Sequence, residues 1–238
     1  MDYIYGKKPI ENIILNFSLK VKKIYLQKGI AFSPDIYKII KEKNILWVSL
    51  EKKDLNKIIK EKVVHQGFIA EVTKFEFTHI KDIFLSTNKN QVLLMLDRIQ
   101  DPYNFGSIIR SASLFGVDGI IIQEHNQVDI TPIVFKASAG TIYNVPIIKV
   151  SNLSNAINAL KQNGFWIYAT SLADDAKNLT EISFEKKSLI IIGNEGDGIM
   201  KKIINKSDLV VKIKTKQNID SLNVSVATGI LLFKAFTN

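Results

Sequence analysis

Cysteine is absent from the 238-residue chain, which excludes disulfide bonds and zinc sites built from cysteine. Long apolar stretches are absent too, since no run of about 18 apolar residues occurs that could cross a membrane. The first residues, Met1 to Gly6, lack the basic-then-apolar pattern of a secretion signal. We therefore expect a cytoplasmic protein with no membrane segment, and we expect no bound metal.

Arginine is scarce. Of the 32 basic residues, 30 are lysine, and the two arginines are Arg98 and Arg110. Lysine serves wherever a generic positive charge is enough, so a retained arginine indicates a need for a planar, bidentate fork of donors. Both arginines lie in one short segment, which is where we look for chemistry. Chance retention is the alternative, above all for Arg98.

The positive charge is concentrated at the front of the chain. Residues 1–90 carry 17 lysines and 10 acidic residues, a net charge of +7, whereas residues 91–238 carry 15 basic and 13 acidic residues, a net charge of +2. This asymmetry favours a polyanionic partner for the front part. A general bias toward solvated lysine is the other explanation, and composition alone does not separate the two.

Apolar strands alternate with amphipathic helices along the chain. Before residue 80, short runs such as Lys23–Leu26 and Ile45–Val48 alternate with helical patterns, which predicts a small α/β unit. From residue 91 the strands become continuously apolar, as in Val92–Leu96 and Leu189–Ile192. Such strands are typical of a parallel sheet with helices on both faces, and such a sheet binds ligands in the loops after its strands.

The polar run at 86–90 is the best candidate for a boundary between two domains. We expect a first domain over residues 1–77, a linker over 78–90 and a second domain over 91–238. With 46% hydrophobic residues, the chain has enough apolar material to give each domain a core.

The first of three polar loops, residues 101–110, follows a predicted strand and combines Asp-Pro with Asn-x-Gly. Asn104 or Ser107 is expected to cap the next helix. Arg110 would then lie near the start of that helix, a position that attracts anions, so a docked phosphate would explain a cation there. An ion pair with Asp97 or Asp101 is the alternative.

The other two loops follow later strands. Residues 193–198 hold three glycines around Glu195, which lets a ligand approach the backbone, although a plain strand-to-helix turn would use glycine too. In the third loop, Ser221 or Asp220 is expected to cap the last helix, with Asn223 and Ser225 beside its free N–H groups.

Together the three loops resemble the three motifs of the SpoU family of RNA 2′-O-methyltransferases, part of the SPOUT superfamily. The order and spacing of the motifs match as well. The matching residues are Leu96, Asp97, Asp101, Pro102, Asn104, Gly106, Ser107, Ile108 and Arg110, then Ile192, Gly193, Glu195, Gly196, Gly198 and Ile199, then 221–227. At the front, Tyr5-Gly6 and His65-Gln66-Gly67 are similar to the small RNA-binding domain of that family.

This resemblance implies the fold, the partners and the site. It implies a parallel-sheet SPOUT domain with a deep trefoil knot, an L30e-like α/β domain in front of it, and a homodimer joined through the knotted domains. S-adenosylmethionine would be the methyl donor. The implied catalytic residues are Arg110, Asn104, Glu195, Ser221 and Asn223. The implied cofactor-binding residues are Gly193, Gly196, Ile213, Leu222 and Asn223.

Within the family the chain is most similar to the bacterial enzymes that methylate a guanosine ribose of 23S ribosomal RNA. One departure concerns Ile213–Asn218, which lacks the proline, methionine and glycine usual there and puts donor binding at Ile213 in question. Methylation of transfer RNA is one alternative, and an RNA-binding scaffold without activity is another. A dinucleotide-dependent oxidoreductase is disfavoured because the glycine cluster comes late and does not read G-x-G-x-x-G.

Overall fold

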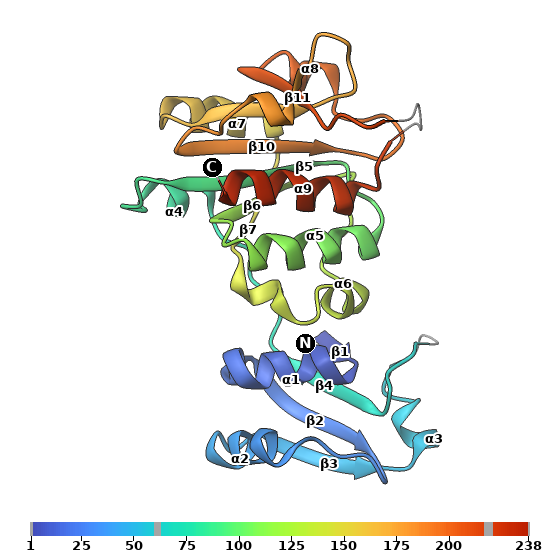
Figure 1. Cartoon of the computed structure of the whole chain (residues 1–238). Coiled ribbons are helices and arrows are strands. Elements are labelled where there is room, and N and C mark those ends of the chain that lie inside the picture. Colours follow the sequence, from blue (N-terminus) through green and yellow to red (C-terminus); the bar gives the residue numbers. More distant parts are fainter. Residues whose placement is uncertain (1, 60–62, 217–220, 238) are drawn as a thin grey trace. The chain divides into compact units, whose positions relative to one another are not determined.

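The computed structural model describes residues 2–59, 63–216 and 221–237 and divides the chain into two compact units. The first unit contains Met1–Glu76 and Ile130–Tyr143, and the second contains Phe77–Asp129 and Asn144–Asn238. Figure 1 labels the elements of both units.

The first unit is built on a four-stranded sheet in the order β1-β4-β2-β3. Strands β2 and β3 pair in parallel, whereas β4 runs antiparallel to both of its neighbours. Its elements are β1 (Asp2–Tyr5), α1 (Lys7–Phe17), η1 (Ser18–Lys20), β2 (Val21–Gln27), α2 (Pro34–Glu42), β3 (Leu46–Leu50), α3 (Lys52–Leu55), β4 (Phe68–Val72) and α6 (Pro132–Ala137). The predicted small α/β unit at the front is confirmed.

The second unit is built on a seven-stranded sheet in the order β7-β6-β5-β10-β8-β11-β9, in which every neighbouring pair is parallel. Its elements are α4 (Ile80–Phe84), β5 (Gln91–Asp97), α5 (Pro102–Leu114), β6 (Gly119–Gln123), β7 (Ile147–Val150), α7 (Leu153–Gln162), β8 (Trp166–Thr170), β9 (Lys177–Asn178), η3 (Leu179–Glu181), β10 (Lys187–Gly193), α8 (Lys201–Ile204), β11 (Leu209–Lys212) and α9 (Val224–Phe236); η2 (Thr141–Asn144) joins the units. The predicted parallel-sheet domain is confirmed.

Helices cover both faces of this sheet, which explains why its strands are apolar on both sides. Leu93, Leu94, Met95 and Leu96 of β5 are all fully buried, so alternate side chains face opposite layers. One layer packs against α4, α7 and α8. On the opposite side α5 and α9 lie next to each other, with α9 against β10 (Figure 1).

Helix α5 begins earlier than the sequence pattern suggested. Asp101 is its N-cap, with a carboxylate oxygen 3.0 Å from the Tyr103 nitrogen, and Pro102 takes the first helical position. The expected caps Asn104 and Ser107 both lie inside the helix. Arg110 is therefore well inside α5 rather than in its first turn, and the helix-start argument for a phosphate beside it was wrong.

The expected linker over residues 78–90 is wrong in its first part. It contains α4, whose Ile83 is 6% exposed within the core of the second unit, and a capping box between His79 and Asp82 begins the helix. Thr78 already pairs with Ile148 of β7. The short helix was missed because five residues carry too little periodicity beside the polar run that follows.

A second difference from the expected domains is that residues 130–143 belong to the first unit. Gly140 has a φ of +81°, and a Cβ there would lie 2.5 Å from the Pro9 carbonyl oxygen. Asn12 of α1 also donates to the Ala139 carbonyl at 3.2 Å. Such a contact between distant segments leaves no local pattern in the sequence. The trefoil knot implied by the resemblance stays a prediction.

His65 holds the turn before β4 through both of its ring nitrogens. Nδ1 accepts from the Gly67 nitrogen at 2.9 Å, so the proton of the neutral ring lies on Nε2, which is 2.8 Å from the Asn56 amide oxygen. Burial lowers the pKa of His65, and the charge of Lys52 lowers it further. These two hydrogen bonds give His65 a structural role in the turn before β4.

The pKa shift of His65 makes the stability of the chain pH-dependent. The pKa of His65 in the folded chain lies below the ordinary value near 6.5. The neutral ring therefore contributes its full share to the free energy of unfolding at any pH above 6.5. Stability is then lost as the pH falls through the folded pKa, where protonation also removes the acceptor for Gly67. We expect a larger fall in melting temperature between pH 7.5 and pH 5 for the wild type than for His65→Gln. Parallel melting curves for the two proteins would contradict this role.

Candidate functional site

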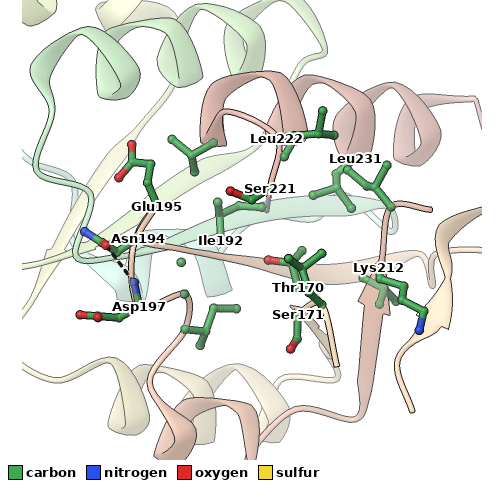
Figure 2. Close-up of a pocket in the computed structure, with 18 of the residues that line it drawn as sticks. Thr170, Ser171, Ile192, Asn194, Glu195, Asp197, Lys212, Ser221, Leu222 and Leu231 are labelled. Atoms are coloured by element: carbon green, nitrogen blue, oxygen red, sulfur yellow. Dashed lines mark hydrogen bonds between the residues drawn. The ribbon is translucent and has the colours of Figure 1, made fainter. Parts of the chain in front are cut away.

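A pocket of about 430 Å³ lies at the carboxyl ends of β8, β10 and β11. This is the end of a parallel sheet at which ligands are expected. Figure 2 shows Thr170 and Ser171 on one side of Ile192, and Ser221 and Leu222, on the segment that leads into α9, on the other.

The glycine loop, residues 193–198, forms one wall of this pocket and folds back on itself. The Asn194 amide oxygen accepts from the nitrogens of Gly196 at 2.7 Å and Asp197 at 3.3 Å, and the Asn194 carbonyl accepts from the Gly198 nitrogen at 3.0 Å. A Cβ on Gly193 would lie 2.2 Å from the Gly198 carbonyl carbon, so only glycine fits there. The loop is thus a closed, pocket-lining turn rather than a plain connection into a helix.

The start of α9 is capped by Asn223 rather than by Ser221. The Asn223 amide oxygen accepts from the Ser225 nitrogen at 2.9 Å and from the Val226 nitrogen at 3.4 Å. Ser221, one of the expected caps, lines the pocket instead. Asp220, the other, lies outside the described residues.

A chain of side-chain hydrogen bonds joins the three loops. The Asn104 amide nitrogen of α5 donates to the Glu195 carboxylate of the glycine loop. The Asn104 amide oxygen accepts from the Asn223 amide nitrogen at 3.0 Å. Segments 91 and 119 residues from Asn104 in sequence therefore meet at one amide group, beside the pocket that Glu195 lines.

Arg110 lies apart from this chain of bonds. It is exposed, is not among the residues that line the pocket, and makes no hydrogen bond or ion pair with any residue that the structure describes. The alternative of a local ion pair is wrong, because Asp101 caps α5 and Asp97 binds Arg98 and the Met200 nitrogen. Arg110 lies six positions after Asn104, about 9 Å along the helix axis.

The structure brings most of the other expected site residues to the pocket. The lining includes Gly193, Glu195, Gly196, Ile213, Ser221 and Leu222. Asn104 donates to Glu195 and Asn223 donates to Asn104, but neither asparagine lines the pocket itself.

Sequence reasoning missed three polar residues at strand ends. Thr170 is the last residue of β8 and Ser171 follows it; both line the pocket, and the Thr170 hydroxyl donates to the Ile191 carbonyl at 3.0 Å. Lys212 ends β11, and its ammonium donates to the Ala173 and Asp174 carbonyls at 3.2 and 2.9 Å. In the sequence, the one sign of these residues was their position at the ends of apolar strands. The ends of β8 and β11 lie together only because the two strands are neighbours in the sheet.

The unusual segment after β11 is described in part. Ile213 and Thr215 line the pocket, whereas Gln217 and Asn218 lie outside the described residues. The charged residues in the lining are Glu195, Asp197 and Lys212.

Across residues 2–59, 63–216 and 221–237 no cluster of histidine, aspartate or glutamate could hold a metal ion. No helix in those ranges combines the length and apolar character that crossing a bilayer requires.

Comparison with known proteins extends over the whole chain. A model of the SpoU rRNA Methylase family matches residues 91–233, and a model of the RNA 2′-O ribose methyltransferase substrate binding domain matches residues 3–78. A Staphylococcus aureus protein assigned to the TrmH family of tRNA/rRNA methyltransferases is 34% identical over 239 residues, which cover 98% of this chain and 94% of the relative.

Two solved structures share the fold. An AdoMet-bound rRNA methyltransferase from Sinorhizobium meliloti aligns with a TM-score of 0.79 at 24% identity, over 98% of this chain and 86% of that one. The SpoU methyltransferase AviRb from Streptomyces viridochromogenes, in complex with AdoMet, aligns with a TM-score of 0.80 at 20% identity, over 99% of this chain and 89% of that one.

The family model covers the pocket, the glycine loop and the hydrogen-bonded asparagines together, and the sequence relatives span both units. The chain therefore belongs to the SpoU rRNA methylase family and is an RNA methyltransferase.

Proposed function

We propose that this enzyme transfers a methyl group from S-adenosylmethionine to a ribose 2′-hydroxyl of RNA, and that its target is a guanosine of 23S ribosomal RNA in the cytoplasm. The observation that carries this proposal is the hydrogen-bonded chain Glu195–Asn104–Asn223, which joins the three motifs beside one pocket. Its strongest support outside the structure is the family match over both units.

The pocket fits the proposed donor in size and in chemistry. Its volume of about 430 Å³ falls within the ordinary range for small-ligand sites, roughly 300–1,000 Å³. Ile192, Val211 and Leu231 offer apolar surface for an adenine ring, and the backbone at the strand ends offers polar groups for its edge. Glu195 and Asp197 place negative charge at the glycine loop, which suits a sulfonium cation.

Bound S-adenosylmethionine would supply an electrophilic methyl group: the ribose 2′-oxygen would take the methyl carbon from sulfur, S-adenosylhomocysteine would leave, and the hydroxyl proton would pass to solvent water. Residues of the chain position the two reactants for this transfer, and positioning can supply much of a rate enhancement. Asn104 fixes the positions of the Glu195 and Asn223 side chains through its two hydrogen bonds, and Ser221 places a hydroxyl at the pocket. Arg110 acts as a bidentate clamp on the target phosphate and stabilises the developing alkoxide.

Arg110 reaches that position through a homodimer. It shares one face of α5 with Tyr103 and Leu114, whose exposed fractions are 61% and 73%. The neighbouring face of α9 exposes Phe233 and Phe236 at 59% and 68%. An exposed apolar surface of this kind typically marks an interface. A second copy covering it would place Arg110 at the subunit boundary rather than in solvent.

The proposed RNA partner fits the front of the chain. Residues 1–90 carry a net charge of +7, and residues 3–78 match the substrate-binding family model. A separate RNA-binding unit favours ribosomal RNA as the substrate over transfer RNA. The intact hydrogen-bonded site argues against a scaffold that has lost activity.

The proposed activity predicts methyl transfer from labelled S-adenosylmethionine to 23S ribosomal RNA, followed by a mapped 2′-O-methylguanosine. Bulk transfer RNA is the matched control substrate. Label in transfer RNA alone would overturn the ribosomal substrate, and label in neither RNA would favour the scaffold.

Arg110→Lys keeps the positive charge but loses the fork of donors, so we expect a fall in kcat on the order of 100-fold. The donor Kd should stay unchanged, because Arg110 does not line the pocket. Single-turnover methyl transfer and calorimetric donor binding measure the two quantities. Near-normal activity of Arg110→Lys would contradict the proposed bidentate contact of the Arg110 guanidinium with the target phosphate.

The proposed homodimer predicts that Phe233→Glu, which places a charge on the α5/α9 face, gives monomers at micromolar concentration. Leu19→Glu is the matched control, because Leu19 is 86% exposed and lies in the first unit. Sedimentation velocity distinguishes the forms. A monomeric wild type, or a dimeric Phe233→Glu protein, would contradict the interface.

A further inference from the structure

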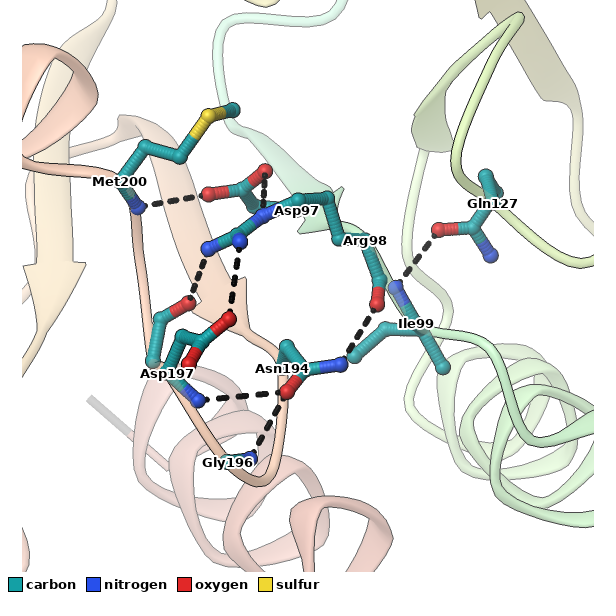
Figure 3. A network of polar contacts seen from close by, with 9 residues as sticks. Asp97, Arg98, Ile99, Gln127, Asn194, Gly196, Asp197 and Met200 are labelled. Atoms are coloured by element: carbon teal, nitrogen blue, oxygen red, sulfur yellow. Dashed lines mark hydrogen bonds and ion pairs between the residues drawn. The ribbon is translucent and has the colours of Figure 1, made fainter.

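The other arginine of the chain, Arg98, follows β5 directly and contacts the glycine loop with both its main chain and its side chain (Figure 3). Its guanidinium donates from Nη1 to the Asp197 carboxylate at 3.2 Å and from Nη2 to the Gly198 carbonyl at 3.0 Å. Its main-chain carbonyl accepts from the Asn194 amide nitrogen at 3.0 Å. One residue therefore contacts three of the residues that line the pocket.

The base of this contact is buried and fixed. Asp97, the last residue of β5, is 0% exposed; one of its carboxylate oxygens lies 3.3 Å from Arg98 Nε, and the other accepts from the Met200 nitrogen at 2.7 Å. The Arg98 side chain itself is only 22% exposed. A buried carboxylate needs such partners, so Asp97 orients the guanidinium and also anchors the chain just after the glycine loop.

The backbone of Arg98 has an unusual conformation that its neighbours hold in place. Arg98 has a φ of +64°, in the left-handed region that most side chains avoid. The next residue is held on both sides, because the Ile99 nitrogen donates to the Gln127 amide oxygen at 2.9 Å and the Ile99 carbonyl accepts from the Val128 nitrogen at 3.0 Å. A strained conformation kept in place by its surroundings is typical of functional sites.

We propose that Arg98 is a positioning residue that holds the glycine loop in its donor-binding shape, with Asp97 as its support. The inference rests on the proposed function of the pocket as the S-adenosylmethionine site. The loop has glycine at three of its six positions, so its backbone samples many conformations unless it is tied down. The fork of Arg98 ties the loop at two points, which a single ammonium group cannot do in the same geometry.

This role predicts a loss of donor affinity rather than of chemistry. In Arg98→Ala the Kd for S-adenosylmethionine should rise roughly tenfold or more, because two charge-assisted hydrogen bonds to the loop are lost. Arg98→Lys should weaken binding by at least about threefold, since it keeps the charge but not both bonds. At saturating donor, kcat should stay within about threefold of the wild type, and the Kd for ribosomal RNA should not change.

The matched control is Lys161→Ala. It removes a cation of the same unit that lies 2.6 Å from the Asp208 carboxylate, away from the pocket. If the effect of Arg98 passes through Asp197, the double variant Arg98→Ala/Asp197→Ala should weaken donor binding by less than the sum of the two single-variant effects. If Arg98→Ala only destabilised the fold, its melting temperature would fall, as any effect of Lys161→Ala on stability would also show. The donor Kd of the folded fraction of Arg98→Ala would then equal that of the wild type.

Isothermal titration calorimetry with S-adenosylmethionine on the full chain, together with thermal melting, separates the outcomes. A wild type that does not bind the donor would overturn the proposed function of the pocket. A wild type that binds, with Arg98→Ala and Arg98→Lys within twofold of its Kd, would overturn the role of Arg98 alone. If Arg98→Ala does not fold, Arg98→Lys provides the same test.

Discussion

The amide group of Asn104 is the contact on which the site depends. It donates to the Glu195 carboxylate through its nitrogen and accepts from Asn223 through its oxygen, so it joins the first turn of α5, the loop after β10 and the residue that caps α9. A side-chain amide does both at once without a charge, whereas an ionised aspartate cannot donate and a lysine ammonium cannot accept. The partners it joins are themselves fixed: Glu195 lies in the glycine loop, and Asn223 caps α9.

The two arginines of this chain show how residue choice reveals physical need. Arg98 is mostly buried and makes contacts that use the separate donors of its fork. Arg110 is exposed on α5 among apolar side chains. Arg98 is therefore paired within its own unit, whereas Arg110 makes no hydrogen bond or ion pair with any residue that the structure describes. Lysine, the default cation here, would not reproduce the contacts of Arg98, because it provides a point charge rather than a planar set of donors.

The parallel sheet explains why the pocket lies where it does. Strands β5 and β10 pair so that Asp97 stands beside Gly193, and the loops after both strands leave from the same edge. The buried Asp97 then reaches across to the segment after the glycine loop. Because the strands below are fully buried and packed on both faces, this edge is a rigid base for loops rich in glycine and polar residues.

The sequence by itself determined the alternation of buried strands and helices, the parallel sheet, and the loops that form the pocket, because each leaves a local pattern of apolar and turn-forming residues. It also singled out both arginines, although it favoured chance for Arg98. Only the tertiary structure decided that α5 begins at Pro102, that Asn223 rather than Ser221 caps α9, that 130–143 packs with the first unit, and that Arg98 contacts the glycine loop. The physical reason is that these features depend on contacts between residues about 100 positions apart, or on a choice among several adequate caps, and neither leaves a mark within a short window of sequence.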